Sequence, residues 1–315
     1  MLRLFLHRLA VSVPLLVLVS AVTFILQALI PGDPARTLLG VNASQEQYLE
    51  LRQALNLDAP FLTRYWDYLS GVLQGDLGES LFTSIPVITS VLQRLPVTLT
   101  LMAGAAVLAA AIGIVLGVWS ATRGRAVSKA VDALSMVGFA LPNFWLGLVL
   151  VSIFAISIPI FPATGFTSFE DDSVAWLMCL ILPWAALALN GIASIGKVTR
   201  DSMKTTLDMD YIRTLRAAGV KRRSLVWKHA LKNSGVPVLT MTGLTMIHFL
   251  SGTVLVENVF GWPGLGTVIS QAVIQKDYPL VQGILLVLGA AVLVLNMVVD
   301  VVLGVLDPRS RTGRS

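Results

Sequence analysis

The stretch "LRAAGVKRRSLVWKHALKNSGV", residues 215–236, is basic and helix-like, yet it lies between two long apolar runs. The whole chain of 315 residues is 55% hydrophobic and 13% charged. Soluble domains carry about 25% charged residues, so about half of the usual solvating charge is missing. The composition therefore predicts a membrane protein that holds this one segment in water.

Runs without Asp, Glu, Lys or Arg locate the membrane spans. A helix needs about 20 apolar residues to cross the hydrocarbon layer, and lipid forces every backbone amide to pair internally. The third run is interrupted by the turn-like "IPIFPATGF" at 158–166. We predict an all-α, polytopic membrane protein with six transmembrane helices within residues 9–32, 95–122, 133–169, 173–196, 233–256 and 278–299.

Most of the 23 Lys and Arg residues fall in alternate connecting segments. The positive-inside rule then predicts cytoplasmic N- and C-termini and a cytoplasmic loop between spans four and five. We expect four regions: a first transmembrane helix (1–30), an external segment (31–95), a five-helix core (96–306) that includes the cytoplasmic loop 197–236, and a cytoplasmic tail (307–315).

The external segment has the pattern of short amphipathic helices. Ser44 is followed three residues later by Gln47, which is a capping-box spacing. Two helical faces are predicted by the apolar spacing: Tyr48, Leu51 and Leu55 in the first helix, and Phe61, Tyr65, Trp66, Leu69 and Leu73 in the second. The alternative is a connector without a role of its own.

The sequence contains no convincing catalytic or metal site. "GIASIGKV", residues 191–198, approaches the phosphate-binding loop, but Val198 replaces the hydroxyl residue that binds magnesium. Its glycines also lie near the end of a predicted membrane helix, so we interpret the match as chance. The histidines His7, His229 and His248 are scattered, and one cysteine, Cys179, builds no disulfide or zinc site. We do not expect an enzyme.

The basic segment has two apolar faces. Tyr211, Leu215 and Ala218 share one face, and Ala217, Ala218 and Gly219 form a patch of small residues that another backbone could approach. After Gly219, a second face has Leu225, Val226 and Ala230, with Lys221, Arg222, Arg223, Lys228 and Lys232 around it. The pattern favours two short helices that form a docking surface. A loop that only sets topology or lies on anionic lipid is the alternative.

An ordered series of motifs resembles one family over nearly the whole chain. The series includes "LIPGDPARTLLG", "LPNFWLGLVL", "DMDYIRTLRAAGVKRRSLVWKHALKNSGVPVL", "VENVFGWPGLG" and "LDPR". It is similar to permease subunits of bacterial ABC importers in the dipeptide/oligopeptide/nickel branch, the binding-protein-dependent transport inner membrane components. The wider family signature opens Glu-Ala-Ala, whereas this chain has Arg213, Thr214 and Leu215. This departure makes the transfer of individual contacts less direct.

The resemblance implies an assembly in the cell membrane. Its expected partners are a second homologous permease, two ABC ATPase subunits or one fused ATPase, an external substrate-binding protein and membrane lipid, without nucleic acid. ATP and magnesium would belong to the ATPases, and this chain would hold no cofactor. The implied coupling helix spans 211–219, with docking residues Tyr211, Leu215, Arg216, Ala217, Ala218, Gly219, Val220 and Lys221. Peptides are the implied substrate, with nickel chelates, glutathione or another small solute as alternatives.

Polar residues inside spans are costly and often functional. Candidates for the translocation pathway are Asn143, Asn190, Thr245, His248 and Glu257. Interhelical hydrogen bonding is the alternative role for each. "GIVLG", with Gly113 and Gly117, is typical of a helix contact. A stand-alone secondary transporter would show internal repeats and paired intramembrane charges, which we do not find. A membrane scaffold that binds partners without transport is the other alternative.

Overall fold

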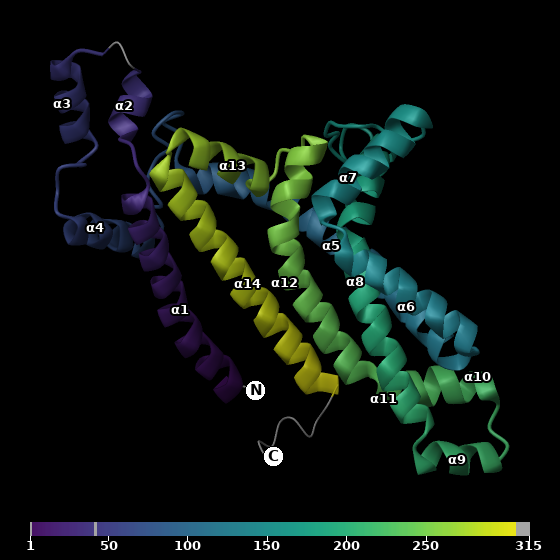
Figure 1. The fold of residues 1–315 in the computed structure, drawn as a ribbon. Helices are drawn as coiled ribbons and strands as arrows, with labels where there is room; N and C mark the ends of the chain where they lie inside the picture. Colours follow the sequence, from purple (N-terminus) through teal and green to yellow (C-terminus); the bar gives the residue numbers. More distant parts are fainter. Residues whose placement is uncertain (1, 41–42, 307–315) are drawn as a thin grey trace. The chain divides into compact units, whose positions relative to one another are not determined.

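The computed structural model describes residues 2–40 and 43–306, and the predicted tail at 307–315 lies outside this part of the chain. The described residues are mostly helical, and the extended pairing in them is one bridge between Glu79 and Pro86. They divide into two compact units (Figure 1). The N-terminal unit comprises Leu2–Thr98 and Pro263–Leu293, and the central unit comprises Leu99–Trp262 and the chain from Val294.

Five continuous helices in the described part are long and apolar enough to cross a membrane. Each overlaps one of the uncharged windows, so five of the predicted spans are confirmed. The helices are α1 (Leu2–Leu29), α5 (Val87–Thr122), α8 (Ser173–Leu207), α12 (Gly235–Phe260) and α14 (Tyr278–Leu306).

The remaining span is not the single helix that the sequence predicted. It consists of α6 (Arg125–Ala140) and α7 (Asn143–Val151), which continues into the π-helix η1 (Ser152–Ser157). The two parts are bent by 100° at Leu141 and Pro142. Both residues are extended, with ψ of 125° and 139°. Proline lacks an N–H and disfavours helical geometry in the residue before it, which explains the break. A count of charges cannot detect this break, although the proline itself is a local signal for it.

In the central unit, α8 is the helix against which α6, α7 and α12 pack. Helix α5 also approaches α8 closely, and glycines allow this approach. A Cβ on Gly117 of α5 would lie 2.5 Å from Thr199 Cβ and 2.6 Å from the Gly196 carbonyl oxygen. A Cβ on Gly113 would lie 3.1 Å from the Ile192 carbonyl oxygen. The predicted helix contact at "GIVLG" is therefore confirmed.

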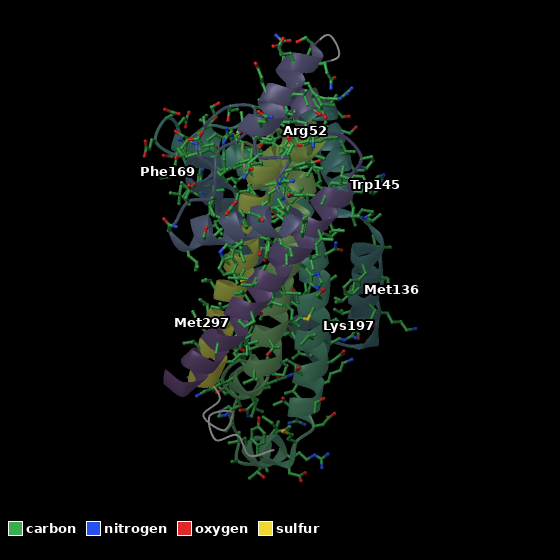
Figure 2. All side chains as sticks on the ribbon, turned by 90° about the vertical axis from the view of Figure 1, so that its left-hand side faces the viewer. Arg52, Met136, Trp145, Phe169, Lys197 and Met297 are labelled. Atoms are coloured by element: carbon green, nitrogen blue, oxygen red, sulfur yellow. The ribbon has the colours of Figure 1, made fainter. Side chains whose placement is uncertain are left out.

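The phosphate-loop match lies entirely within the continuous helix α8. Its two glycines are packing positions: Gly196 faces Gly113, and a Cβ on Gly191 would lie 2.8 Å from both Ala109 and Phe249. Lys197 projects from the helix and is exposed (Figure 2). A phosphate-binding loop needs a strand before it and a helix after it. The interpretation as a chance match is confirmed.

In the N-terminal unit, short helices follow α1: α2 (Pro34–Leu39), α3 (Gln45–Ala54) and α4 (Phe61–Leu73). The predicted capping box is present, because Gln47 N donates to Ser44 Oγ and Ser44 N donates to Gln47 Oε1. The unit also contains α13 (Leu265–Gln275) and the first turns of α14. Buried Asp277 joins α13 and α14 to the loop after α4, since its carboxylate accepts from Ser80 Oγ and from the Leu81 amide.

An ion-pair network holds α2 and α3 together. Arg52 Nη1 lies 2.9 Å from Asp33 Oδ2, and Arg52 also pairs with Asp58. Burial alone would raise the pKa of Asp33, but hydrogen bonds from Tyr48 and the Ala35 amide, together with the charge of Arg52, lower it below its usual value. The network keeps Asp33 ionised, so its carboxylate is already bound within the protein. Figure 2 labels Arg52, the arginine of this network.

The predicted apolar face of α4 is only partly correct. Tyr65 and Leu69 are half-buried, whereas Trp66 and Leu73 are 71% and 89% exposed. The face that turns inward instead includes Arg64 and Tyr68. Tyrosine and arginine have apolar stems with polar tips, so hydrophobic spacing alone does not show which face of the helix is covered.

Candidate functional site

The basic segment forms a helical hairpin at the end of α8 (Figure 1). It consists of α9 (Asp210–Ala217), α10 (Arg222–Ser224), η2 (Leu225–Ala230) and α11 (Leu231–Asn233), which leads into α12. With 35 residues, α8 is about 52 Å long, whereas the hydrocarbon layer is about 30 Å thick. Because α8 is longer than the layer, its last turns can carry the hairpin into water.

The bend of the hairpin is a Schellman motif. Gly219 N donates to the Arg216 carbonyl, and Val220 N donates to the Leu215 carbonyl. Gly219 has φ of +81°, and a Cβ placed on it would find no atom within 4 Å. The glycine is therefore required for its backbone conformation, as at many helix C-termini. Among the described residues, no neighbour crowds it.

Buried side chains anchor the hairpin. Ile212 is the fully buried residue of α9, and the predicted second apolar face is confirmed, since Leu225, Val226 and Ala230 are all buried. Val226 and Ala230 form one cluster with Val118 of α5 and Met203 of α8. Of the other predicted face, on α9, Tyr211 and Ala218 are exposed and Leu215 is half-buried, so this face does not anchor the hairpin within the chain. An eight-residue helix has too few turns for apolar spacing to fix its buried side.

Polar contacts fix the hairpin to the long helices. Arg222 Nη2 donates to the carbonyl of Thr122, the last residue of α5, at 2.8 Å. A cation at a helix C-terminus is favourable, because the last carbonyls lack partners and the helix dipole is negative there. Asn233 donates to the hydroxyl of Tyr211, which links the two ends of the hairpin. These contacts connect the hairpin to the end of α5 and close it between α9 and α11.

We call the exposed side of α9 and its bend the docking face. It comprises Asp210, Tyr211, Arg213, Thr214, Arg216, Ala217, Ala218, Gly219 and Lys221. Of the predicted docking residues, Leu215 and Val220 are half-buried and the other six belong to this face. Nearby, Trp227 of η2 is 47% exposed, and the sequence analysis did not single it out. The face is basic around a small-residue centre.

The intramembrane candidates do not form one cluster. Asn190 Nδ2 donates to Asn143 Oδ1 at 2.6 Å, so these two side chains join α8 to the start of α7. A Cβ on Gly252 of α12 would lie 2.9 Å from Asn143 Nδ2, so a third helix closes over the pair. Thr245 is buried, and its hydroxyl donates to the Met241 carbonyl of its own helix.

His248 and Glu257 occupy opposite environments on α12. Glu257 is completely buried near the end of the helix, whereas His248 is exposed. Leu244, His248, Ser251 and Leu255 are all exposed and are spaced by four, three and four residues. This spacing places them on one face of a helix. We call this face the α12 stripe.

An ion pair that the sequence analysis missed lies between α6 and α8. Arg200 Nη1 pairs with Asp132, and Arg200 Nε lies 2.9 Å from Asp201 Oδ1. Lys204 Nζ of α8 also donates to Ser128 of α6 at 3.4 Å. Asp132 and Arg200 are far apart in sequence, and nothing in the pattern of either segment pairs them. The contact fixes the first part of the broken span to the central helix.

Comparisons with known proteins cover both parts of the chain. The family described as binding-protein-dependent transport system inner membrane component matches residues 113–312. The N-terminal family of the same kind of membrane component matches residues 1–102.

The curated relatives match from end to end. A Brucella abortus protein assigned to peptide transport as a permease is 37% identical over 312 residues, which cover 99% of both chains. The di/tripeptide transport system permease DppB of Pseudomonas aeruginosa is 36% identical over 330 residues, 98% of each chain. The dipeptide transport system permease DppB of Escherichia coli is 35% identical over 336 residues, 99% of each chain.

The family and the apolar helices together identify a multi-pass protein of the cell membrane. The N-terminal match ends and the larger match begins within α5, at residues 102 and 113, and the hairpin lies within the larger match. The chain belongs to the family of binding-protein-dependent transport system inner membrane components.

Proposed function

We propose that this chain is the permease subunit of an ATP-driven importer of short peptides and forms half of its translocation pathway. The observation that carries the proposal is the end-to-end similarity to relatives named as peptide, di/tripeptide and dipeptide permeases. The assembly would include a second permease, cytoplasmic ATPase subunits that bind ATP and magnesium, and an external binding protein.

The docking face is the proposed contact with an ATPase. Its small residues Ala217, Ala218 and Gly219 are exposed, so a groove on a soluble partner could approach the backbone of α9 closely. Ile212 and the cluster around Val226 hold the hairpin from the other side. A surface that is anchored on one side and open on the other is suited to a partner rather than to the interior of this chain.

Coupling would follow from these anchors. Closure of the ATPases on ATP would displace α9, and the contacts of the hairpin would pass the displacement to α5, α8 and α12. In thermodynamic terms, nucleotide shifts the population between inward- and outward-facing states because it binds them with different affinity.

The α12 stripe is the proposed pathway surface of this chain. His248 and Ser251 present polar atoms from the middle of a membrane helix on a face that the described residues leave exposed. Polar groups at membrane depth usually face a cavity or another protein rather than lipid. We assign Asn143 and Asn190 the role of positioning α7 on α8, since they bond to each other.

Reconstitution tests the proposal. The chain should be purified with its second permease and ATPases, placed in proteoliposomes and supplied with the binding protein. ATP-dependent accumulation of a labelled dipeptide is expected, and it should disappear without ATP. Accumulation of a nickel chelate or a sugar, without dipeptide uptake, would contradict the peptide assignment.

A further inference from the structure

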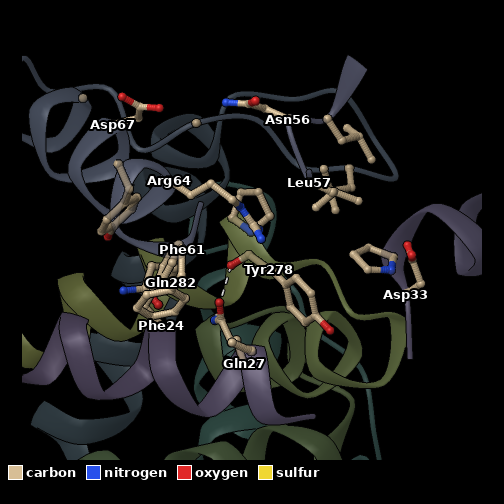
Figure 3. Close-up of a pocket in the computed structure, with 18 of the residues that line it drawn as sticks. Phe24, Gln27, Asp33, Asn56, Leu57, Phe61, Arg64, Asp67, Tyr278 and Gln282 are labelled. Carbon is tan, nitrogen blue, oxygen red and sulfur yellow. Dashed lines mark hydrogen bonds between the residues drawn. The ribbon is translucent and has the colours of Figure 1, made fainter. Parts of the chain in front are cut away.

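A pocket of about 470 Å³ lies within the N-terminal unit (Figure 3). Its walls come from the end of α1, the start of α14 and one side of α4, with Phe24 and Gln27 from α1, Phe61 and Arg64 from α4, and Tyr278 from α14. This volume is within the range of about 300–1,000 Å³ that is typical of small-molecule sites. The pocket is therefore large enough for a ligand of drug-like size.

The wall from α4 follows helical periodicity. Phe61, Arg64, Tyr68 and Gly71 line the pocket and are spaced by three, four and three residues, which places them on one side of the helix. Gly71 allows the next loop to close the edge, because a Cβ there would lie 3.1 Å from the Asp76 carbonyl oxygen. The Asp76 amide donates to the Gly71 carbonyl at 2.9 Å. This wall is held by backbone contacts as well as by side chains.

Arg64 places a positive charge in the pocket, and this charge forms no ion pair with the described residues. Among the described residues, no carboxylate lies within 4.0 Å of its guanidinium, whereas Arg52, the other arginine of the lining, is bound to Asp33 and Asp58. The guanidinium carbon of Arg64 lies 5.8 Å from the centre of the Phe24 ring. In Figure 3 the Arg64 side chain extends toward Tyr278. The pocket thus contains a cation beside aromatic rings, to which an anionic group can bind.

Asp67 supplies the opposite charge on the same helix. It lines the pocket three residues after Arg64, is exposed, and forms no ion pair within the described part of the chain. Side chains three positions apart on a helix have Cβ atoms about 5–6 Å apart. Two extended residues span at most about 7 Å, which sets the separation of the two charged ends of a dipeptide. The lining therefore offers one cation and one carboxylate from the same helix, which are partners for the two charges of a zwitterion.

We propose that this pocket binds a short peptide in its zwitterionic form. The peptide carboxylate lies on Arg64, its ammonium group lies at Asp67, and an apolar side chain packs among Phe24, Phe61 and Tyr278. Gln27 is a further donor. Its hydrogen bond to the Tyr278 carbonyl is long, at 3.5 Å, so the amide can turn to a ligand instead. The identity of the zwitterion as a peptide rests on the proposed function.

The same two charges occur in phosphatidylethanolamine, whose headgroup carries a phosphate and an ammonium group. The end of α1 and the start of α14 bring the pocket to the ends of two membrane spans, where such headgroups lie. The test must therefore separate a peptide from a lipid.

The experiment uses the assembled transporter in nanodiscs of phosphatidylcholine, without ATP or binding protein. Binding of labelled Ala-Phe is measured for the wild type, Arg64→Gln and Asp67→Asn. Arg36→Gln and Glu50→Gln are matched controls, since both residues lie in the same unit but outside the lining. We expect Arg64→Gln to weaken binding about tenfold to hundredfold, the loss for one charge-assisted hydrogen bond. Asp67→Asn should weaken it less, and the controls should bind like the wild type.

Equal binding by Arg64→Gln and Arg36→Gln would overturn the proposal. Retention of phosphatidylethanolamine by the wild type, lost in Arg64→Gln, with no binding of Ala-Phe, would also overturn it and identify a lipid site. Uptake of Ala-Phe by the wild type in proteoliposomes distinguishes failure of this inference from failure of the proposed function. If uptake occurs and Arg64 has no effect, only this inference fails; if no peptide is taken up, the proposed function fails.

Discussion

Glycine has two different roles in the α5–α8 contact and in the bend of the cytoplasmic hairpin. At Gly117 the neighbouring helix leaves no room for a Cβ, which would lie 2.6 Å from a backbone oxygen of Gly196. At Gly219 the space around a Cβ is open, but φ is +81°. At Gly117 glycine is required because there is no space for a side chain, and at Gly219 it is required for the backbone conformation.

This difference changes what a substitution can show. A large residue at Gly117 acts on the fold through overpacking, whereas any L-residue at Gly219 acts first through strain. A bulky residue at Gly219 would therefore weaken docking through strain in the hairpin, even if Gly219 itself did not contact the partner. Ala218, which is exposed and has φ of −74°, is free of this ambiguity.

The largest effect is expected for Gly117→Val. The added side chain must displace the backbone of α8, so the free energy of unfolding should fall by about 1–3 kcal/mol or more. Thermal unfolding of the purified chain in detergent measures the loss. Gly124→Ala is the matched control, since a Cβ there meets nothing within 4 Å. Similar melting temperatures for the two variants would show that the helices do not meet as described.

A somewhat smaller loss is expected for Asn190→Ala, which removes the partner of Asn143. An unpaired buried amide costs about 1–3 kcal/mol, and since Asn143 is half-buried the loss should lie at the lower end of this range. In a double-mutant cycle, Asn143→Ala and Asn190→Ala should be coupled, whereas Thr245→Val should add independently to either, since its hydroxyl bonds within α12. Additive effects at Asn143 and Asn190 would argue against the positioning role and for separate contacts with substrate.

Gly219→Ala should cost about 1–2 kcal/mol, the penalty for a left-handed non-glycine residue. Gly219→Asn should cost less, because asparagine tolerates this conformation. Hydrogen exchange of the amides in α9 reports the change locally. Equal protection in wild type and both variants would mean that the glycine conformation does not hold the end of α9.

The smallest effect concerns the alkaline stability of the N-terminal unit. Burial raises the pKa of Tyr68 to about 12, although the Gln282 amide acts in the opposite direction. The unfolded phenol ionises near pH 10. The raised pKa in the folded state means that this contribution to stability is complete below pH 10 and is lost as pH rises toward about 12. Melting between pH 8 and pH 11.5 should show a shallower decline for Tyr68→Phe; an unchanged decline would contradict it.

The sequence was sufficient where a property depends on composition or on short spacing. Uncharged runs located five continuous spans, and Ser44 with Gln47 located a cap, because both signals are local. Pro142 is a local signal for a break in the helix, but the angle of 100° depends on packing, and the ion pair of Arg200 with Asp132 joins residues distant in sequence. The inward face of α4 was only partly predicted, because arginine and tyrosine can also cover apolar surface.

The docking of ATPases through the hairpin is the central claim, and co-purification of the ATPases with Ala218→Trp tests it most directly. If the docking face enters a groove, the added ring should overpack the contact and reduce affinity about fivefold to hundredfold, while the melting temperature of the isolated chain stays unchanged. Arg223→Gln should have a much smaller effect, since exposed charge pairs contribute about 0–1 kcal/mol. Normal ATPase recovery with Ala218→Trp, combined with loss in Arg223→Gln, would contradict the docking account and favour a segment that lies on anionic lipid.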